Sequence, residues 1–164
     1  MQRSNALIAF IATTATIAAC ASTSSTESAQ PRLDQASAAG AKIEILAEGG
    51  FAALSVNHVV RHDDRYFLFT QRRICNGVCP AIDSASGALS VAATDSLFKI
   101  ILPASLALKD DYGATPGGAD MMSYSIRVTT GGSTKTITAD DGTMPPELRQ
   151  IVTAVRQVVD AARK

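Results

Sequence analysis

The sequence predicts an α+β domain in which a small antiparallel sheet of two hairpins is packed by a middle helix and an amphipathic C-terminal helix. Apolar and polar residues alternate over residues 43–48 and 124–128, a pattern typical of strands with one buried face. From Leu148 onward, apolar residues instead recur every three or four positions, which predicts a helix. Helices on one face of the sheet would bury both patterns in a single core.

The first hairpin is expected between residues 43 and 72. Its first strand covers residues 43–48 and is broken by Gly49-Gly50. A second strand is expected from Leu54 to His62, and Asp63-Asp64 supplies the turn into a return strand over residues 66–72.

The middle of the chain predicts a helix followed by a long loop. Residues 88–91 are expected to form a short extra strand, and Thr94-Asp95-Ser96 resembles a helix start. Because proline lacks an amide hydrogen, Pro103 is expected to end or kink this helix. Residues 110–120 are rich in Gly, Pro and Asp and predict a loop.

The C-terminal part predicts a hairpin and then the closing helix. Gly131-Gly132 supplies the turn between strands at residues 124–128 and 134–138. Thr143 or Asp141 is expected to cap the helix, with prolines in its first turn. Its apolar stripe is interpreted as core rather than as a membrane-surface helix, because the polar face carries mixed charge. The stripe consists of Leu148, Ile151, Val152, Val155, Val158 and Val159.

The N-terminus predicts a bacterial lipoprotein signal. Residues 1–5 are polar with one positive charge, Arg3, and residues 6–19 are almost entirely apolar. The stretch ends in Ile17-Ala18-Ala19-Cys20, in which small residues precede a cysteine that can be acylated. A plain secretory signal is the alternative. We therefore expect residues 1–19 to be removed and Cys20 to carry the lipid.

The lipid would tether the protein to the cell envelope. Residues 20–41 are rich in Ser, Thr and Ala without apolar periodicity and predict a flexible tether, which leaves residues 42–164 as the folded domain. Ala21, rather than Asp, follows the cysteine, which favours the outer membrane over the inner membrane.

Cys75 and Cys79 are expected to form a disulfide. Their separation suits the Asn76-Gly77 turn, and an oxidising envelope compartment favours the bond. We interpret it as a local staple rather than a redox-active pair, which usually has two intervening residues. A zinc site is disfavoured because no second Cys/His pair completes four ligands.

The remaining chemistry argues against an enzyme. Lys and Arg together number 15, as do Asp and Glu together, so no basic excess suggests nucleic acid as a partner.

His58 and His62 are four residues apart in a strand-like segment, which separates them by roughly 13 Å. We therefore expect that they share no metal and that both take a solvated position on one face. The pairs Asp110-Asp111 and Asp140-Asp141 are expected to accept backbone hydrogen bonds in turns, and a carboxylate dyad is the alternative. Neither a nucleophile motif nor a phosphate-binding glycine pattern occurs in the folded part, so no cofactor is expected.

Three segments together resemble the emfourin family, small bacterial proteins that include inhibitors of thermolysin-like zinc metalloproteases. They are Gly49-Gly50-Phe51, the stretch from Gly118-Ala119-Asp120 to Val128, and residues 141–148 before the last helix. The resemblance covers about residues 42–162 and implies a small α+β domain, in agreement with the periodicity. The Cys75–Cys79 insertion and the lipid anchor depart from the family pattern.

The resemblance implies that the domain binds and inhibits a secreted thermolysin-like metalloprotease. The alternative is a non-inhibitory assembly lipoprotein that binds another envelope component. The loop over residues 110–120 is either a binding loop or an ordinary connection, and Phe51 is either an anchor for a partner's apolar pocket or a core residue. The candidate contact residues are Gly49, Gly50, Phe51, Asp110, Asp111, Tyr112 and Asp120.

Overall fold

The computed structural model of the chain describes residue 38, residues 40–75 and residues 79–164. These residues belong to one compact unit, Arg32–Lys164. The predicted signal peptide and Cys20 lie outside the described residues, as does nearly all of the predicted tether.

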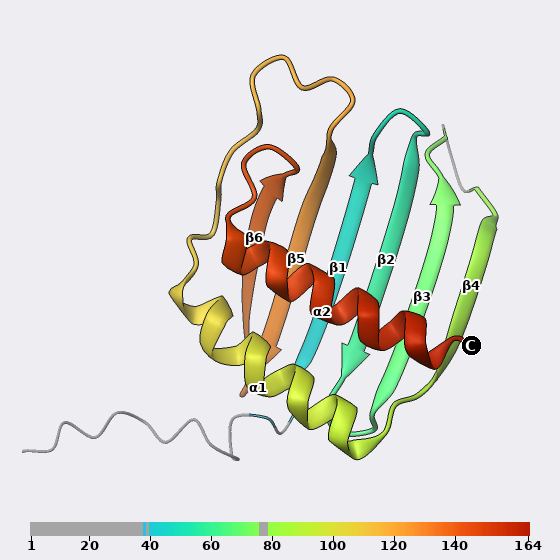
Figure 1. Cartoon of the computed structure of the whole chain (residues 1–164), viewed down its shortest axis with the longest axis vertical. Helices are drawn as coiled ribbons and strands as arrows, with labels where there is room; N and C mark the ends of the chain where they lie inside the picture. The colour runs from blue at the N-terminus through green and yellow to red at the C-terminus, as the bar shows by residue number, and fades with distance from the viewer. Residues whose placement is uncertain (1–37, 39, 76–78) are drawn as a thin grey trace, which may run out of the picture. The chain divides into compact units, whose positions relative to one another are not determined.

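A six-stranded sheet, antiparallel throughout, forms one layer of this unit (Figure 1). Its spatial order is β4-β3-β2-β1-β5-β6, which places the first strand of the chain near the centre. The strands are β1 (Lys42–Gly49), β2 (Leu54–Arg61), β3 (Tyr66–Arg73), β4 (Ala81–Ala88), β5 (Met122–Thr130) and β6 (Ser133–Asp140).

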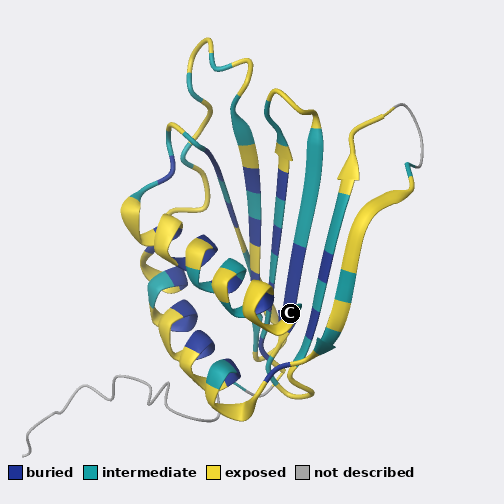
Figure 2. Ribbon diagram, turned by 45° about the vertical axis from the view of Figure 1, so that its right-hand side comes forward, coloured by how far each residue is buried: buried dark blue, intermediate teal, exposed yellow. Residues whose placement is uncertain are grey.

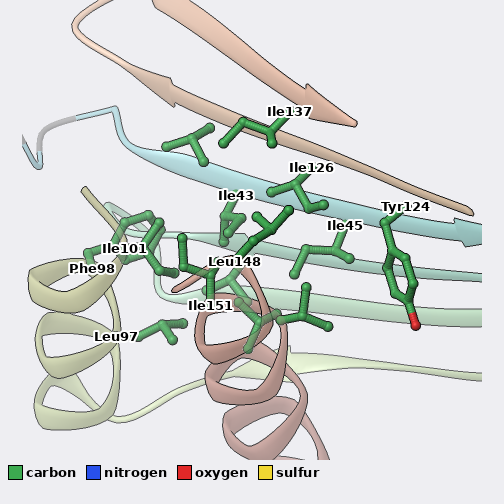
Figure 3. Packing of buried hydrophobic residues seen from close by; sticks show 14 of the residues in the cluster. Ile43, Ile45, Leu97, Phe98, Ile101, Tyr124, Ile126, Ile137, Leu148 and Ile151 are labelled. Carbon is green, nitrogen blue, oxygen red and sulfur yellow. The ribbon is translucent and has the colours of Figure 1, made fainter. Parts of the chain in front are cut away.

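Two helices, α1 (Val91–Ala107) and α2 (Pro146–Ala162), cover the same face of the sheet (Figure 1). Their inward sides meet the alternate apolar residues of the strands, as Figure 3 shows for Ile45, Ile126 and Leu148. The α+β prediction is therefore confirmed. In the part of the chain that the structure describes, neither helix is long and apolar enough to cross a membrane.

The register of the strands explains why the alternation of apolar and polar residues predicts the buried side of the sheet. Ile45 lies opposite His58 on β2 and opposite Ile126 on β5, so one side of all three strands faces the helices. Ile43, Ile45 and Ala47 are fully buried there, while Glu44 and Glu48 lie on the other side. The predicted strands on either side of Gly49-Gly50 and of Gly131-Gly132 are confirmed.

The extra strand predicted at residues 88–91 is wrong. The strand is β4, Ala81–Ala88, and Val91 already begins α1. β4 is rich in Ala and Ser and lacks apolar alternation, so its extended backbone is set by antiparallel pairing with β3.

The predicted ends of α1 also need correction. The helix begins one turn earlier than Thr94-Asp95-Ser96, because the Ser90 side chain caps it by accepting from the amide of Ala93 at 3.1 Å. Pro103 lies inside the helix, which continues to Ala107. Leu102 and Ser105 are buried on the inward side around Pro103, so packing holds the turn in which one amide donor is missing.

The apolar stripe of α2 is confirmed as core, since all its members are buried except the half-buried Val158. Its predicted side-chain cap is wrong: Pro145 occupies the cap position and no side chain caps the helix. Thr143 instead donates to the carboxylate of Asp140 at 3.0 Å.

Candidate protein-contact site

Four connections lie at one end of the sheet (Figure 1). They are the β1–β2 turn at Gly50–Ala53, the described ends of the β3–β4 connection, the loop between α1 and β5, and the connection from β6 to α2. The described chain enters the domain at the opposite end, at Ala38–Ala41. Most of the predicted contact residues therefore lie at the end of the sheet remote from this entry.

The last residue of β1, where the chain enters the β1–β2 turn, must be glycine. Gly49 has a φ of +110°, and a Cβ there would lie 2.8 Å from the carbonyl oxygen of Met121. The Gly50 amide donates to that same carbonyl at 3.3 Å. This contact joins the turn to the end of the 110–120 loop, so the structure brings Gly49, Gly50 and Asp120 together.

Phe51 sits at the tip of this turn and is 94% exposed. It is therefore not a core residue, which was the alternative. Ile74, 47% exposed, lies beside the turn because its amide donates to the carbonyl of Ala53 at 2.7 Å. An exposed aromatic next to an exposed aliphatic residue is a surface suited to contact with another protein.

Asp110, Asp111 and Tyr112 are held elsewhere, along the edge strand β6. The amide of Thr138 donates to the Asp110 carbonyl at 2.8 Å, and the amide of Tyr112 donates to the Thr138 carbonyl at 2.9 Å. The Thr138 hydroxyl donates to the Asp111 carboxylate at 2.6 Å, the main reason why the pKa of Asp111 is lowered. The Tyr112 ring is half-buried against the core. β6 lies two strands from β1, so the structure does not group these residues with Phe51.

Asp140 fixes the middle of the 110–120 loop, a role the sequence did not reveal. Its carboxylate accepts from the amide and hydroxyl of Thr115 and from the amides of Gly142 and Thr143 at 2.9 and 2.8 Å. These donors, the Thr115 amide foremost, hold the pKa of Asp140 well below its usual range. A Cβ at Gly142 would lie 2.2 Å from the Thr115 hydroxyl oxygen, so the approach requires glycine.

Asp141 completes this network. Its carboxylate accepts from the Met122 amide at 3.2 Å and from the Tyr124 hydroxyl at 2.9 Å. Burial, together with this bond, raises the pKa of Tyr124. The prediction that these acidic pairs accept backbone hydrogen bonds in turns is confirmed for Asp111, Asp140 and Asp141.

The solvated position predicted for His58 is wrong. His58 and His62 do lie on one face, but that face is covered by the helices. His58 is 3% exposed, and its ring packs edge-on against Phe69 at 5.2 Å between centroids. Its Nδ1 is buried, and the part of the chain that the structure describes offers it no hydrogen-bond partner. Burial, and secondarily the charge of Arg156, lowers its pKa to about 4.

His62 is half-buried at the first turn of α1. Its Nε2 lies 3.1 Å from the Asp95 carboxylate, and its ring packs edge-on against Phe98. Within residues 38, 40–75 and 79–164, no group of three or more His, Cys, Asp or Glu side chains is arranged to hold a metal ion.

The predicted disulfide is present. Cys75 and Cys79 are bonded, with their Cα atoms 6.2 Å apart. The bond closes the connection between β3 and β4, next to Ile74 and close in sequence to the start of the edge strand. It thus restrains one of the connections at the Phe51 end of the sheet.

The described residues form a small α+β domain with exposed loops at one end of its sheet. Residues 82–156 match the family model of Emfourin. The chain therefore carries an emfourin-like domain, as the sequence resemblance predicts. No curated protein matches the chain.

The matched segment runs from β4 into α2 and includes the whole 110–120 loop with its Asp140 network. Emfourin is a family of inhibitor domains, so the match implies a metalloprotease-inhibitor domain and is consistent with a non-enzymatic role.

Proposed function

We propose that this protein is a lipid-anchored envelope protein whose emfourin-like domain inhibits a secreted thermolysin-like metalloprotease. The observation that carries the proposal is the family match over residues 82–156. The lipid anchor at Cys20, in the outer membrane, rests on the sequence of the N-terminal signal.

The proposed contact surface is the end of the sheet that carries Phe51. Exposed aromatic residues frequently provide most of the binding energy of an interface when a partner's pocket receives them. Phe51 projects from a turn fixed by the Gly50–Met121 hydrogen bond, and Asp140 holds Thr115 in the neighbouring loop. Ordering these loops in advance reduces the entropy lost on binding.

The entry of the chain supports an outward orientation of this surface. The Gly40 amide donates to the Asp63 carboxylate at 2.8–2.9 Å, which fixes the point of entry. β1 then runs eight residues to the Phe51 turn, a rise of about 26 Å. The tether from Cys20 adds a reach of about 25 Å. An anchored domain would thus present its contact end away from the bilayer.

Titration of a thermolysin-like protease with the chain lacking residues 1–20, using a peptide substrate, tests the inhibitory role. We expect stoichiometric loss of activity with the domain recovered intact. Phe51→Ala should weaken inhibition at least tenfold by removing the exposed anchor. Val91→Ala is the matched control, because Val91 is 55% exposed near the opposite end of the sheet.

Absence of inhibition at micromolar excess, or rapid cleavage of the domain, would overturn the proposal and favour an assembly role in the envelope. Equal inhibition by wild type and Phe51→Ala would retain the function but exclude this contact surface.

A further inference from the structure

The outward side of α1 is apolar, unlike the outward side of an ordinary surface helix. Ile100 is 50% exposed and Leu106 is 56% exposed, and Pro103 and Ala107 are exposed with them. At about 100° per residue these four positions share one side of the helix, opposite the buried Leu97 and Ile101. Figure 2 shows the outward sides of both helices as exposed.

Charge is scarce on this helix. Its 17 residues include two charged side chains, Asp95 and Lys99. Asp95 lies at the N-terminal end and is engaged by His62. Lys99 is exposed on the outward side, and Lys109 is exposed just beyond the helix. Asp110 and Asp111, which are also exposed, follow Lys109 directly. The C-terminal half of α1 thus combines an apolar surface with charges of both signs beyond its end.

A small hollow lies beside this apolar surface. It has a volume of about 140 Å³ and lies between α1 and the β5–β6 hairpin. Leu102 and Leu106 line it from the helix, and Val128 and Lys135 line it from the strands. The hollow thus borders Leu106, and its hairpin side is formed by the buried Val128 and by polar residues such as Lys135.

The described chain enters the domain beside α1. The amide of His62 donates to the carbonyl of Ala41 at 2.9 Å, while the His62 ring contacts Asp95 and Phe98 of the helix. Residues 21–37 belong to the predicted tether between the proposed lipidated cysteine and the described chain, and a flexible chain of that length would span roughly 21–25 Å. Any bilayer that holds Cys20 is thus within reach of this helix.

We propose that the outward side of α1, around Ile100, Pro103 and Leu106, docks on the surface of the lipid bilayer that holds the anchor. This inference rests on the lipid anchor of the proposed function. An apolar helical side immersed at the headgroup boundary gains the free energy of burying its exposed side chains, and Lys99 on the same side attracts anionic headgroups. Docking would add a second membrane contact and fix the orientation of the Phe51 end.

The absence of tryptophan from the sequence provides a direct test. A single tryptophan introduced as Ile100→Trp reports the environment of α1 alone. Thr136→Trp is the matched control, because Thr136 is exposed on the sheet face that the helices leave uncovered. The full lipidated chain is reconstituted into phosphatidylethanolamine–phosphatidylglycerol vesicles whose acyl chains are brominated and quench nearby indole.

We expect the fluorescence of Ile100→Trp to be quenched at least threefold more strongly than that of Thr136→Trp, with a blue shift that appears only with vesicles. Leu106→Trp should behave like Ile100→Trp, which guards against a local effect of one substitution. Thermal unfolding of each variant verifies that the fold is retained.

Equal, weak quenching of both positions in protein that floats with the vesicles would overturn docking and leave the anchor in place. Failure of the full chain to float would overturn the anchor and docking together, whereas the inhibition assay on the unanchored chain is independent of both. A blue shift without vesicles, in a protein with the mass of a dimer, would overturn the bilayer as occupant in favour of a second copy.

Discussion

The two helices of this domain have the same length and pack on the same face of the same sheet, but they differ in the residues on their outward sides. Each has 17 residues and a buried inward side. α2 carries four charged residues, distributed mostly over its outward side, whereas α1 carries two and exposes Ile100 and Leu106. Since core packing constrains only the inward side, the outward side is free to serve another contact.

The ends of the two helices are also held differently. α1 starts with a local cap, Ser90. α2 lacks a side-chain cap and is held at its C-terminus by Arg163, which forms ion pairs with Asp83 of β4 and with Asp160. The Arg163 guanidinium also lies 3.6 Å from the centre of the Phe69 ring. The N-terminus of α1 is thus fixed by the adjacent Ser90, whereas the C-terminus of α2 is fixed mainly by contacts with β3 and β4.

The largest expected effects come from the inward sides, where the helices should behave alike. Leu148→Ala in α2 and Leu97→Ala in α1 should each lower the free energy of unfolding by about 3–5 kcal/mol, because both leucines are fully buried. Urea denaturation, monitored by circular dichroism, measures this free energy. Ile100→Ala should lower the free energy of unfolding by less than about 1 kcal/mol. A loss at Ile100 as large as at Leu148 would mean that the outward side of α1 is covered in solution.

The next largest expected effect is a pH dependence of stability that arises from His58, which α2 covers. The pKa of His58 is about 4 in the folded protein and 6.5 in the unfolded chain. Burial is the largest cause of this difference, followed by the positive charge of Arg156; the charges of Asp160 and Arg163 also act on the ring. The unfolded chain therefore binds the proton first. Stability is complete above about pH 6.5 and should fall by about 3 kcal/mol as the pH drops to 4.

Urea denaturation at several pH values tests this prediction. His58→Leu should flatten the dependence between pH 6.5 and 4, since it removes the titrating group. An unchanged slope in that variant would assign the dependence to other groups.

The smallest effect concerns the start of α1. Ser90→Ala should lower the free energy of unfolding by about 1 kcal/mol, because the Ala93 amide loses its acceptor. Ser96→Ala, at an exposed position inside the same helix, should leave stability unchanged or slightly raised. Thermal unfolding of both variants compares them, and equal stability would show that the cap contributes nothing.

Periodicity and turn residues together predicted most of the fold. β1, β5 and α2 have apolar repeats that mark their buried sides, whereas β2 and β3 were predicted from apolar runs around Asp63-Asp64 and β6 from the Gly131-Gly132 turn. β4 was not predicted, because its small residues show no alternation of apolar and polar side chains. Its backbone is extended because it pairs with β3. At Pro103 the sequence left an end or a kink of the helix open; the helix continues through it, because burial of Leu102 and Ser105 favours continuity.

The candidate site was predicted less completely. The Gly49-Gly50 turn was readable from local chemistry, but the exposure of Phe51 depends on the turn lying beyond the helices. The Asp140–Thr115 contact spans 25 residues, so no short window of sequence contains it. Asp110 to Tyr112 were expected to share the contact, and instead they pair with β6.

The sequence by itself determined the features that arise from neighbouring residues: the strand and helix repeats, the glycine turns, the short disulfide loop and the expectation of a lipid anchor. Only the tertiary structure decided that His58 is buried, that β4 is a strand, and that the Gly49-Gly50 turn lies against the end of the 110–120 loop while Asp111 pairs with β6. Local preferences depend on backbone and side-chain geometry within a few residues, whereas burial and strand pairing depend on which distant segments pack together.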